Sequence, residues 1–164
     1  MVKAPAWTWR GLCRRMMHHT SLRAHVRLHV YRMPDGTFII PTVQLAPDGG
    51  HLEAEPVETV ASADAASLAA ALARAVKRGN PAVPRPSRRS FPQPVVVETA
   101  GAKSWRAFEE MARLTTLDVD GERVRVSPTE RVSGAGFREK AREAREFVGA
   151  RGLEEAASAL LESA

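Results

Sequence analysis

The chain has 164 residues, of which 44% are hydrophobic, 5% aromatic and 26% charged, and its formal net charge is +5. This length suits one domain with a single core, and no segment reaches the roughly 18 uncharged apolar residues that a membrane span requires. The N-terminus lacks the apolar core of a secretory signal peptide. The single cysteine, Cys13, excludes an intrachain disulfide and a cysteine-held zinc site, so we expect a cytoplasmic protein.

Charged residues are segregated along the chain. Residues 1–34 contain seven Lys or Arg and four His but no acid, whereas residues 35–76 contain six acids and one Arg. Residues 77–97 contain five Lys or Arg and again no acid. Such blocks favour a charged macromolecular partner. A surface that is evenly solvated once the chain folds is an equally open interpretation.

The first half of the chain predicts a helix, a β-hairpin and a second helix. A short helix over residues 7–19 precedes a strand that alternates apolar residues with Arg23, His25, Arg27, His29 and Tyr31. This alternation indicates one buried face and one cationic face. A Pro34-Asp35-Gly36 turn leads into the returning strand over 37–45. After a loop over 46–60, a helix over 65–77 is capped by Ser62 or Asp64 and closed by Gly79.

The second half begins after a proline-rich linker over residues 80–94, which we expect to be extended. Residues 95–97 predict a short strand, and Ser104 caps a helix that starts at Trp105. The dipeptide Asp120-Gly121 predicts a second hairpin between strands over 115–119 and 122–127. A charged helix is expected over 137–148 and a final helix over 153–162.

Three cues of the first half return in the same order in the second half. They are a tryptophan-bearing helix (Trp9 and Trp105), an Asp-Gly turn (residues 35–36 and 120–121) and an alanine-rich helix (residues 64–76 and 152–164). We therefore predict an α+β fold with an antiparallel sheet, built as two pseudo-repeats that each contain a helix, a β-hairpin and a helix. The expected organisation is a single domain over 1–164, with repeat one at 1–79, the linker at 80–94 and repeat two at 95–164.

No catalytic or metal-binding constellation is recognisable. His25 and His29 would lie roughly 13 Å apart on a strand, too far to share one ion. Cys13 stands near His18 and His19, but nothing marks an orienting group or an oxyanion site, so a thiol enzyme is a minor alternative. We expect a binding protein without catalysis, cofactor or metal.

Several of these segments together resemble a known family. A run Phe38-Ile39-Ile40-Pro41 leads through Gly49-Gly50 to the helix over 62–76, and a second unit runs from Ser104-Trp105 through residues 124–129 and 134–137 to the helix over 153–161. This order is similar to that of the contact-dependent growth inhibition immunity proteins of bacteria. The resemblance implies a cytoplasmic protein that binds and neutralises the C-terminal toxin domain, commonly a nuclease, of a neighbouring cell's effector. It implies no small-molecule ligand and no membrane association.

The sequence offers two candidate binding surfaces. A cationic toxin would meet the acidic block, which we favour and which consists of Asp48, Glu53, Glu55, Glu58 and Asp64. An acidic toxin would meet the basic strand face, which consists of Arg23, His25, Arg27, His29 and Tyr31. The alternative function is a basic nucleic-acid-binding module, associated with ribosomes or RNA, that uses the blocks at 1–34 and 77–97.

Overall fold

An antiparallel β-sheet forms the centre of the molecule. The structure is a computed structural model, and it describes residues 25–61, 64–87, 92–133 and 136–163. The strands lie in the order β3-β2-β1-β4-β5-β6, and β7 also pairs with β5. The elements are β1 (Val26–Arg32), β2 (Phe38–Leu45), β3 (His51–Val60), α1 (Ala65–Arg78), α2 (Val95–Thr99), α3 (Trp105–Met111), β4 (Arg113–Asp120), β5 (Arg123–Val132), β6 (Gly136–Glu139), a 3-10 turn (Ala141–Glu143), β7 (Arg145–Val148) and α4 (Gly152–Glu162). The predicted α+β class with antiparallel pairing is confirmed.

Both predicted hairpins are present in the described residues. Strands β1 and β2 are antiparallel, and Gly36 in their turn has φ 85°, a value that glycine adopts without strain. Strands β4 and β5 are antiparallel around Asp120-Gly121, where Gly121 has φ 62°. Strand β1 then pairs with β4 from Val26 opposite Val119 to Arg32 opposite Arg113, so the two hairpins form one sheet.

The expected loop over 46–60 is wrong, because most of it is the edge strand β3. This strand pairs with β2 from His51 opposite Leu45 to Val60 opposite Phe38, with a shift of register between Ile40 and Thr42. Edge strands commonly carry charges and proline, which discourage further strands from pairing. The three glutamates and Pro56 of β3 follow that rule, and for this reason the segment resembled a loop.

Two further predicted elements in the second half are wrong. The segment expected as a charged helix over 137–148 instead forms β6, the 3-10 turn and β7. Strand β6 pairs with the second half of β5, and β7 pairs with its first half. The long strand β5 offers backbone groups that need partners, and this tertiary demand overrides the helical propensity of the segment. The strand expected over 95–97 is the short helix α2, whose Val96 and Val97 are fully buried.

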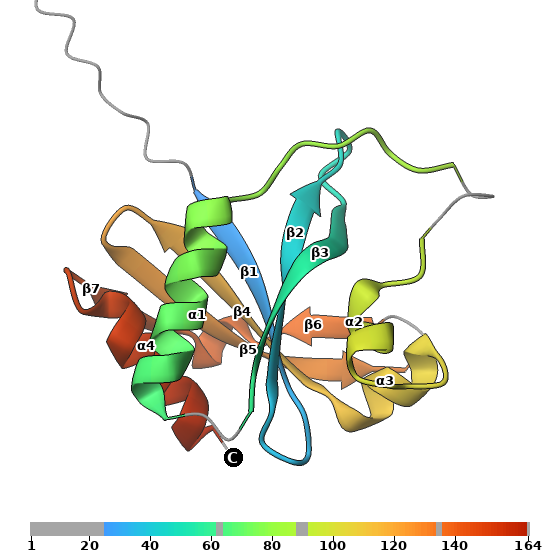
Figure 1. Cartoon of the computed structure of the whole chain (residues 1–164). Coiled ribbons are helices and arrows are strands. Elements are labelled where there is room, and N and C mark those ends of the chain that lie inside the picture. The colour runs from blue at the N-terminus through green and yellow to red at the C-terminus, as the bar shows by residue number, and fades with distance from the viewer. Residues whose placement is uncertain (1–24, 62–63, 88–91, 134–135, 164) are drawn as a thin grey trace, which may run out of the picture.

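Helices cover both faces of the sheet (Figure 1). On one face α1 and α4 pack side by side, and their Leu72 and Leu160 belong to the same core. Asp64 caps α1 by accepting a hydrogen bond from the backbone N–H of Ser67 at 2.8 Å, and Gly79 ends it, both as predicted. On the other face α2 and α3 cover a second core around Phe108. The predicted duplication of the two halves stays a prediction, since the helix expected over 7–19 lies outside the described residues.

No helix in the described part of the chain has both the length and the apolar character that crossing a bilayer requires.

Candidate functional site

Strand β1 has the two faces that the alternation of its residues predicts. Its apolar side chains pack beneath α1 and α4, whereas Arg27, His29 and Tyr31 project to the opposite side of the sheet. There the second core covers Tyr31, which is 2% exposed. The side chains of Arg27 and His29 keep 26% and 13% of their surface. This side of the sheet is therefore apolar and covered at one end, and polar and partly open at the other.

Arg27 is paired with carboxylates from two other strands. Its Nε and Nη2 donate to the two carboxylate oxygens of Asp118 on β4, each at 2.8 Å, and Nη2 lies 3.1 Å from Oε1 of Glu139 on β6. Burial alone would raise the pKa of Asp118, but the hydrogen bond and charge of Arg27 outweigh burial and lower that pKa. The hydrogen bond to Asp118 in turn raises the pKa of Arg27. Arg27, a central residue of the predicted cationic face, is thus neutralised by acids within the chain.

Glu53 of β3 forms a second polar cluster with His29 and Tyr31, which follow Arg27 on the same face of β1. Its Oε1 accepts a hydrogen bond from the hydroxyl of Tyr31 at 2.5 Å and lies 2.7 Å from Nδ1 of His29. Burial, followed by the Glu53 charge and hydrogen bond, raises the pKa of Tyr31 far above its usual value, so its hydroxyl stays protonated and donates. The Glu53 side chain is only 8% exposed, and its Oε2 has no hydrogen-bond partner among the described residues.

A cavity of about 490 Å³ opens over this cluster. Its lining residues come from five elements and the segment before α2, namely His29, Tyr31, His51, Leu52, Glu53, Pro92, Pro94, Trp105, Leu114 and Phe137. The volume lies within the range of small-molecule and side-chain pockets, roughly 300–1,000 Å³. We call it the Glu53 cavity, because Glu53 is the only carboxylate among these lining residues.

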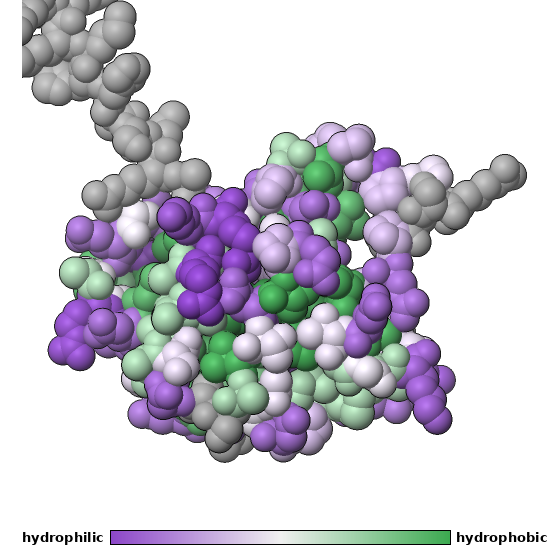
Figure 2. All heavy atoms as spheres, viewed as in Figure 1, coloured by the Kyte–Doolittle hydropathy of each residue, from purple (hydrophilic) through white to green (hydrophobic). Residues whose placement is uncertain are grey.

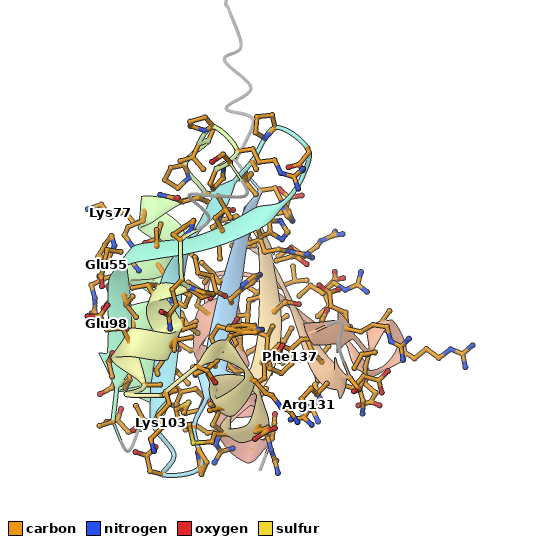
Figure 3. All side chains as sticks on the ribbon, turned by 90° about the vertical axis from the view of Figure 1, so that its right-hand side faces the viewer. Glu55, Lys77, Glu98, Lys103, Arg131 and Phe137 are labelled. Atoms are coloured by element: carbon orange, nitrogen blue, oxygen red, sulfur yellow. The ribbon has the colours of Figure 1, made fainter. Side chains whose placement is uncertain are left out.

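Aromatic rings form one wall of the Glu53 cavity. The rings of Trp105 and Phe108 stack at 5.5 Å, and Phe137 meets Trp105 edge to face at 6.5 Å. Figure 3 faces this side of the molecule and shows Phe137 beside α3. On the other wall the ring of His51 lies edge to face with His29 at 5.7 Å. Burial, followed by the nearby His29 and Arg27, lowers the pKa of His51, so its imidazole is neutral at pH 7.

The structure does not gather the predicted acidic block into one surface. Asp48 pairs with Arg85 in the exposed turn between β2 and β3, and Glu55 accepts from the backbone N–H of Val57 at 3.1 Å. Glu55 lies at the outer edge of the sheet, away from Phe137 (Figure 3). Asp64 is occupied as the cap of α1. Only Glu53 contributes to the cavity.

Glu58, the remaining acid of that block, faces α1 instead. Its two oxygens accept from Arg74 at 2.8 Å and from Arg78 at 2.5 Å, and the Arg74 hydrogen bond lowers its pKa against the opposing effect of burial. Polar residues gather over this C-terminal half of α1 in Figure 2. The pairs fix β3 against the helix, so Glu58 has a structural partner on the opposite side of the sheet from the Glu53 cavity.

The basic strand face is also divided. Arg23 lies outside the described residues, and the exposed His25 has its Nε2 3.2 Å from Asp118. Arg27 and His29 lie on the partly open part of that side of the sheet, whereas Tyr31 is buried in the second core. No group of three His, Cys, Asp or Glu within the described ranges is placed to hold a metal ion. The Cys13 alternative also lies outside those ranges.

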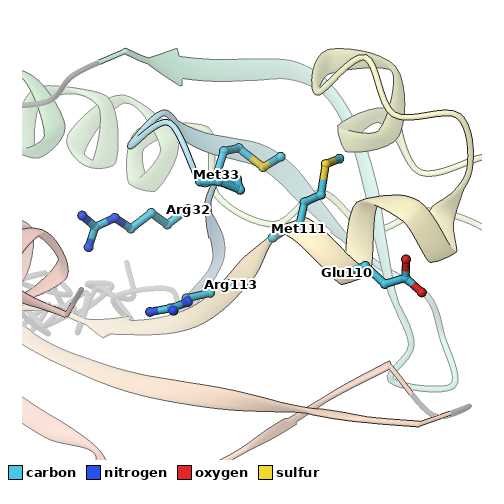
Figure 4. Close-up of a pocket in the computed structure, with 7 residues that line it drawn as sticks. Arg32, Met33, Glu110, Met111 and Arg113 are labelled. Atoms are coloured by element: carbon cyan, nitrogen blue, oxygen red, sulfur yellow. The ribbon is translucent and has the colours of Figure 1, made fainter.

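A second hollow lies near the turn between β1 and β2 (Figure 4). It has a volume of about 470 Å³ and is lined by Arg32, Met33 and Pro34 together with the end of α3 and the start of β4. Arg32 is already engaged there, because its Nη1 donates to the backbone carbonyl oxygen of Ser163 at 3.1 Å. This arrangement ties β1 to the end of α4.

Sequence reasoning missed the residues that complete the site. Asp118 was detectable in part, because it alternates with Leu117 and Val119 and therefore had to lie on the polar face of β4. Phe137 and Glu139 were assigned to a helix that does not exist. Glu139 lies beside Arg27 and Phe137 beside Tyr31 because β6 pairs with β5, and no local pattern encodes that pairing.

No family model and no curated protein matches this chain. Solved structures with the same fold include two that are similar over most of this chain. One is NMB0488, a protein of unknown function from Neisseria meningitidis, with a TM-score of 0.64 and 13% identity, covering 84% of this chain and 92% of that chain. The other comes from a CdiA-CT/CdiI toxin and immunity complex of Yersinia pseudotuberculosis, with a TM-score of 0.61 and 11% identity, covering 83% of this chain and 93% of that chain. At such identities the likeness concerns the fold alone.

Proposed function

We propose that this protein is an immunity protein that binds and neutralises the C-terminal toxin domain of a contact-dependent growth inhibition effector in the cytoplasm. The observation that carries the proposal is the fold. Over 83% of its length, this chain is similar in structure to a chain of a toxin and immunity complex. The order of sequence cues described above resembles the same class of proteins and motivates the same proposal. The toxin domain is proposed to be a nuclease, as is common for that class.

The open side of the sheet supports a binding role. Arg27, Asp118 and Glu139 present paired charges beside a preformed cavity, and such pairs give orientation and specificity to a protein interface. The cavity itself contains a carboxylate–imidazole pair, but the hydroxyl of Tyr31 is held protonated and so is a poor nucleophile. We therefore propose stoichiometric binding without catalysis.

The nucleic-acid alternative receives less support from the described residues. Binding to phosphates requires free cations, whereas Arg27 is paired with two carboxylates and the Tyr31 ring is buried. Residues 1–24 and 88–91, which hold other basic residues, lie outside the described part. The alternative predicts RNA binding that weakens steeply with salt, and a mobility-shift assay at low salt tests it.

The proposed function predicts that a large effector is encoded immediately upstream, and co-expression with the C-terminal domain of that effector tests the proposal. We expect rescue of growth, co-purification, and complete inhibition of the isolated toxin at an equimolar ratio. A toxin domain from an unrelated effector is the control, since it should stay lethal. Continued lethality without a complex would show that the neighbouring toxin is not the partner, and inhibition at far below one equivalent would indicate catalysis.

A further inference from the structure

The Glu53 carboxylate is an incompletely satisfied buried anion. Its side chain is 8% exposed, Oε1 interacts with both Tyr31 and His29, and Oε2 has no partner among the described residues. A buried carboxylate oxygen without a donor is costly, because it has lost water and gained nothing in return. The carboxylate therefore keeps an uncompensated negative charge at the wall of the cavity, and that charge attracts a cation that enters it.

The surroundings of Glu53 favour a cation over a neutral donor. No Lys or Arg is among the residues that line the Glu53 cavity, and the neighbouring Arg27 is engaged by Asp118 and Glu139. The lowered pKa of His51 leaves that imidazole uncharged at pH 7. A positive group would thus meet the carboxylate with no Lys or Arg opposite it, and with the His29 imidazole already in contact with Oε1.

The aromatic wall provides the second element of cation recognition. Trp105 and Phe137 line the same cavity as Glu53. A guanidinium or ammonium group within about 6 Å of such ring faces is attracted by their electron density, most strongly by tryptophan. A planar guanidinium can also stack on the ring while its N–H groups reach a carboxylate.

We infer that the Glu53 cavity is an anchor pocket for a basic side chain, arginine or lysine, of the protein partner. The inference rests on the proposed function and names the chemical group of the toxin domain that this chain recognises. The side chain inserts between the Trp105 and Phe137 wall and the His51 wall, and its positive charge lies against the Glu53 carboxylate. Pockets that lose their water when one long side chain fills them often dominate the affinity of an interface.

The test uses blocked amino acids on the full chain in the absence of any toxin. N-acetyl-arginine amide and N-acetyl-lysine amide are titrated, with N-acetyl-citrulline amide as the uncharged control of equal shape, while NMR follows the His29 and His51 rings and the Trp105 indole. We expect saturable shifts at these residues and binding about tenfold weaker for citrulline, the ratio typical of losing a charged hydrogen bond. The stronger of the two basic probes identifies the preferred side chain.

Two variants and a matched control sharpen the test. Glu53→Gln should weaken binding of the basic probes about tenfold. His51→Glu adds a carboxylate at an exposed position of the wall and should tighten binding severalfold, whereas Glu98→Gln on the exposed surface of α2 should change nothing. Shifts located elsewhere, equal binding of citrulline, no binding at about 50 mM probe, or no gain in His51→Glu would each overturn the inference.

The outcomes separate this inference from the proposed function. If the toxin domain binds and Glu53→Gln leaves its dissociation rate unchanged, the pocket is not the anchor although the immunity role stands. If the basic probes bind in the Glu53 cavity but the neighbouring toxin does not, the pocket stands and the proposed partner is wrong.

Discussion

Replacing Asp118 by asparagine tests whether the network around Arg27 stabilises the open side of the sheet. Asp118 accepts two hydrogen bonds from Arg27 at 2.8 Å, and its side chain is 17% exposed. Asparagine keeps one acceptor oxygen and places an amide NH₂ against the guanidinium, so one charge-assisted hydrogen bond is lost. Such a bond contributes roughly 1.5–3 kcal/mol.

The expected loss lies toward the lower part of that range. Arg27 keeps its contact with Glu139 at 3.1 Å and is 26% exposed, so water and the second carboxylate compensate in part. We expect Asp118→Asn to lower the free energy of unfolding by about 2 kcal/mol. For a chain of this length, that corresponds to a melting temperature lower by roughly 4–8 °C.

Urea unfolding at pH 7, followed by circular dichroism, measures the change. Glu130→Gln is the matched control, because the side chains of Glu130 and Arg138 in that ion pair are 41% and 69% exposed. Removing this exposed pair should change the free energy of unfolding by no more than the experimental error. A double-mutant cycle with Arg27→Met isolates the coupling of Arg27 to Asp118. A coupling energy near zero, or equal losses in Asp118→Asn and Glu130→Gln, would refute the reasoning.

The pH dependence supplies a second readout of Asp118. Its pKa is lowered in the folded state, so the stabilisation is fully present above the pKa of the unfolded state. It is lost as the pH falls through the lower pKa of the folded state. We therefore expect the difference in stability between the parent and Asp118→Asn to shrink below about pH 4. A difference that stays constant down to pH 2 would contradict this assignment.

Three further predictions concern residues around the Glu53 cavity. Ser104→Ala removes the side chain that caps α3 and should cost about 1 kcal/mol in urea unfolding, whereas full retention of stability would show that the cap is dispensable. Phe108→Ala empties a fully buried position and should cost about 3–5 kcal/mol, while Met111→Ala, at 41% exposure, should cost under about 0.5 kcal/mol by the same measurement. Tyr31→Phe removes a donor to Glu53 and should cost about 1–3 kcal/mol, and a neutral effect would mean that the hydrogen bond contributes nothing net.

The parts of the fold that the sequence predicted are those fixed by neighbours in the chain. The turns at Asp35-Gly36 and Asp120-Gly121 need residues that accept particular backbone angles, and Asp64 caps the helix three residues before Ser67. Each requirement is local, so each leaves a local pattern.

The elements that were wrong are fixed by distant partners. Strand β3 is defined by the edge of β2, and β6 and β7 exist because β5 is long enough to pair with both. The site shows the same division, because alternation placed Arg27 and His29 on one face correctly. The carboxylates that contact Arg27 and His29 depend on the order of the strands in the sheet. Asp118, for example, lies 91 residues from Arg27 in the chain, so no local pattern links the two.

The central position of β1 has a consequence for how the protein is produced and handled. Its pairing with β4 closes a very long stretch of chain, and such pairings slow folding relative to helical proteins of equal size. Until that pairing forms, β1 presents an open row of backbone donors and acceptors to other chains. A fragment that ends before β4 should therefore aggregate, and the whole chain should refold best when dilute.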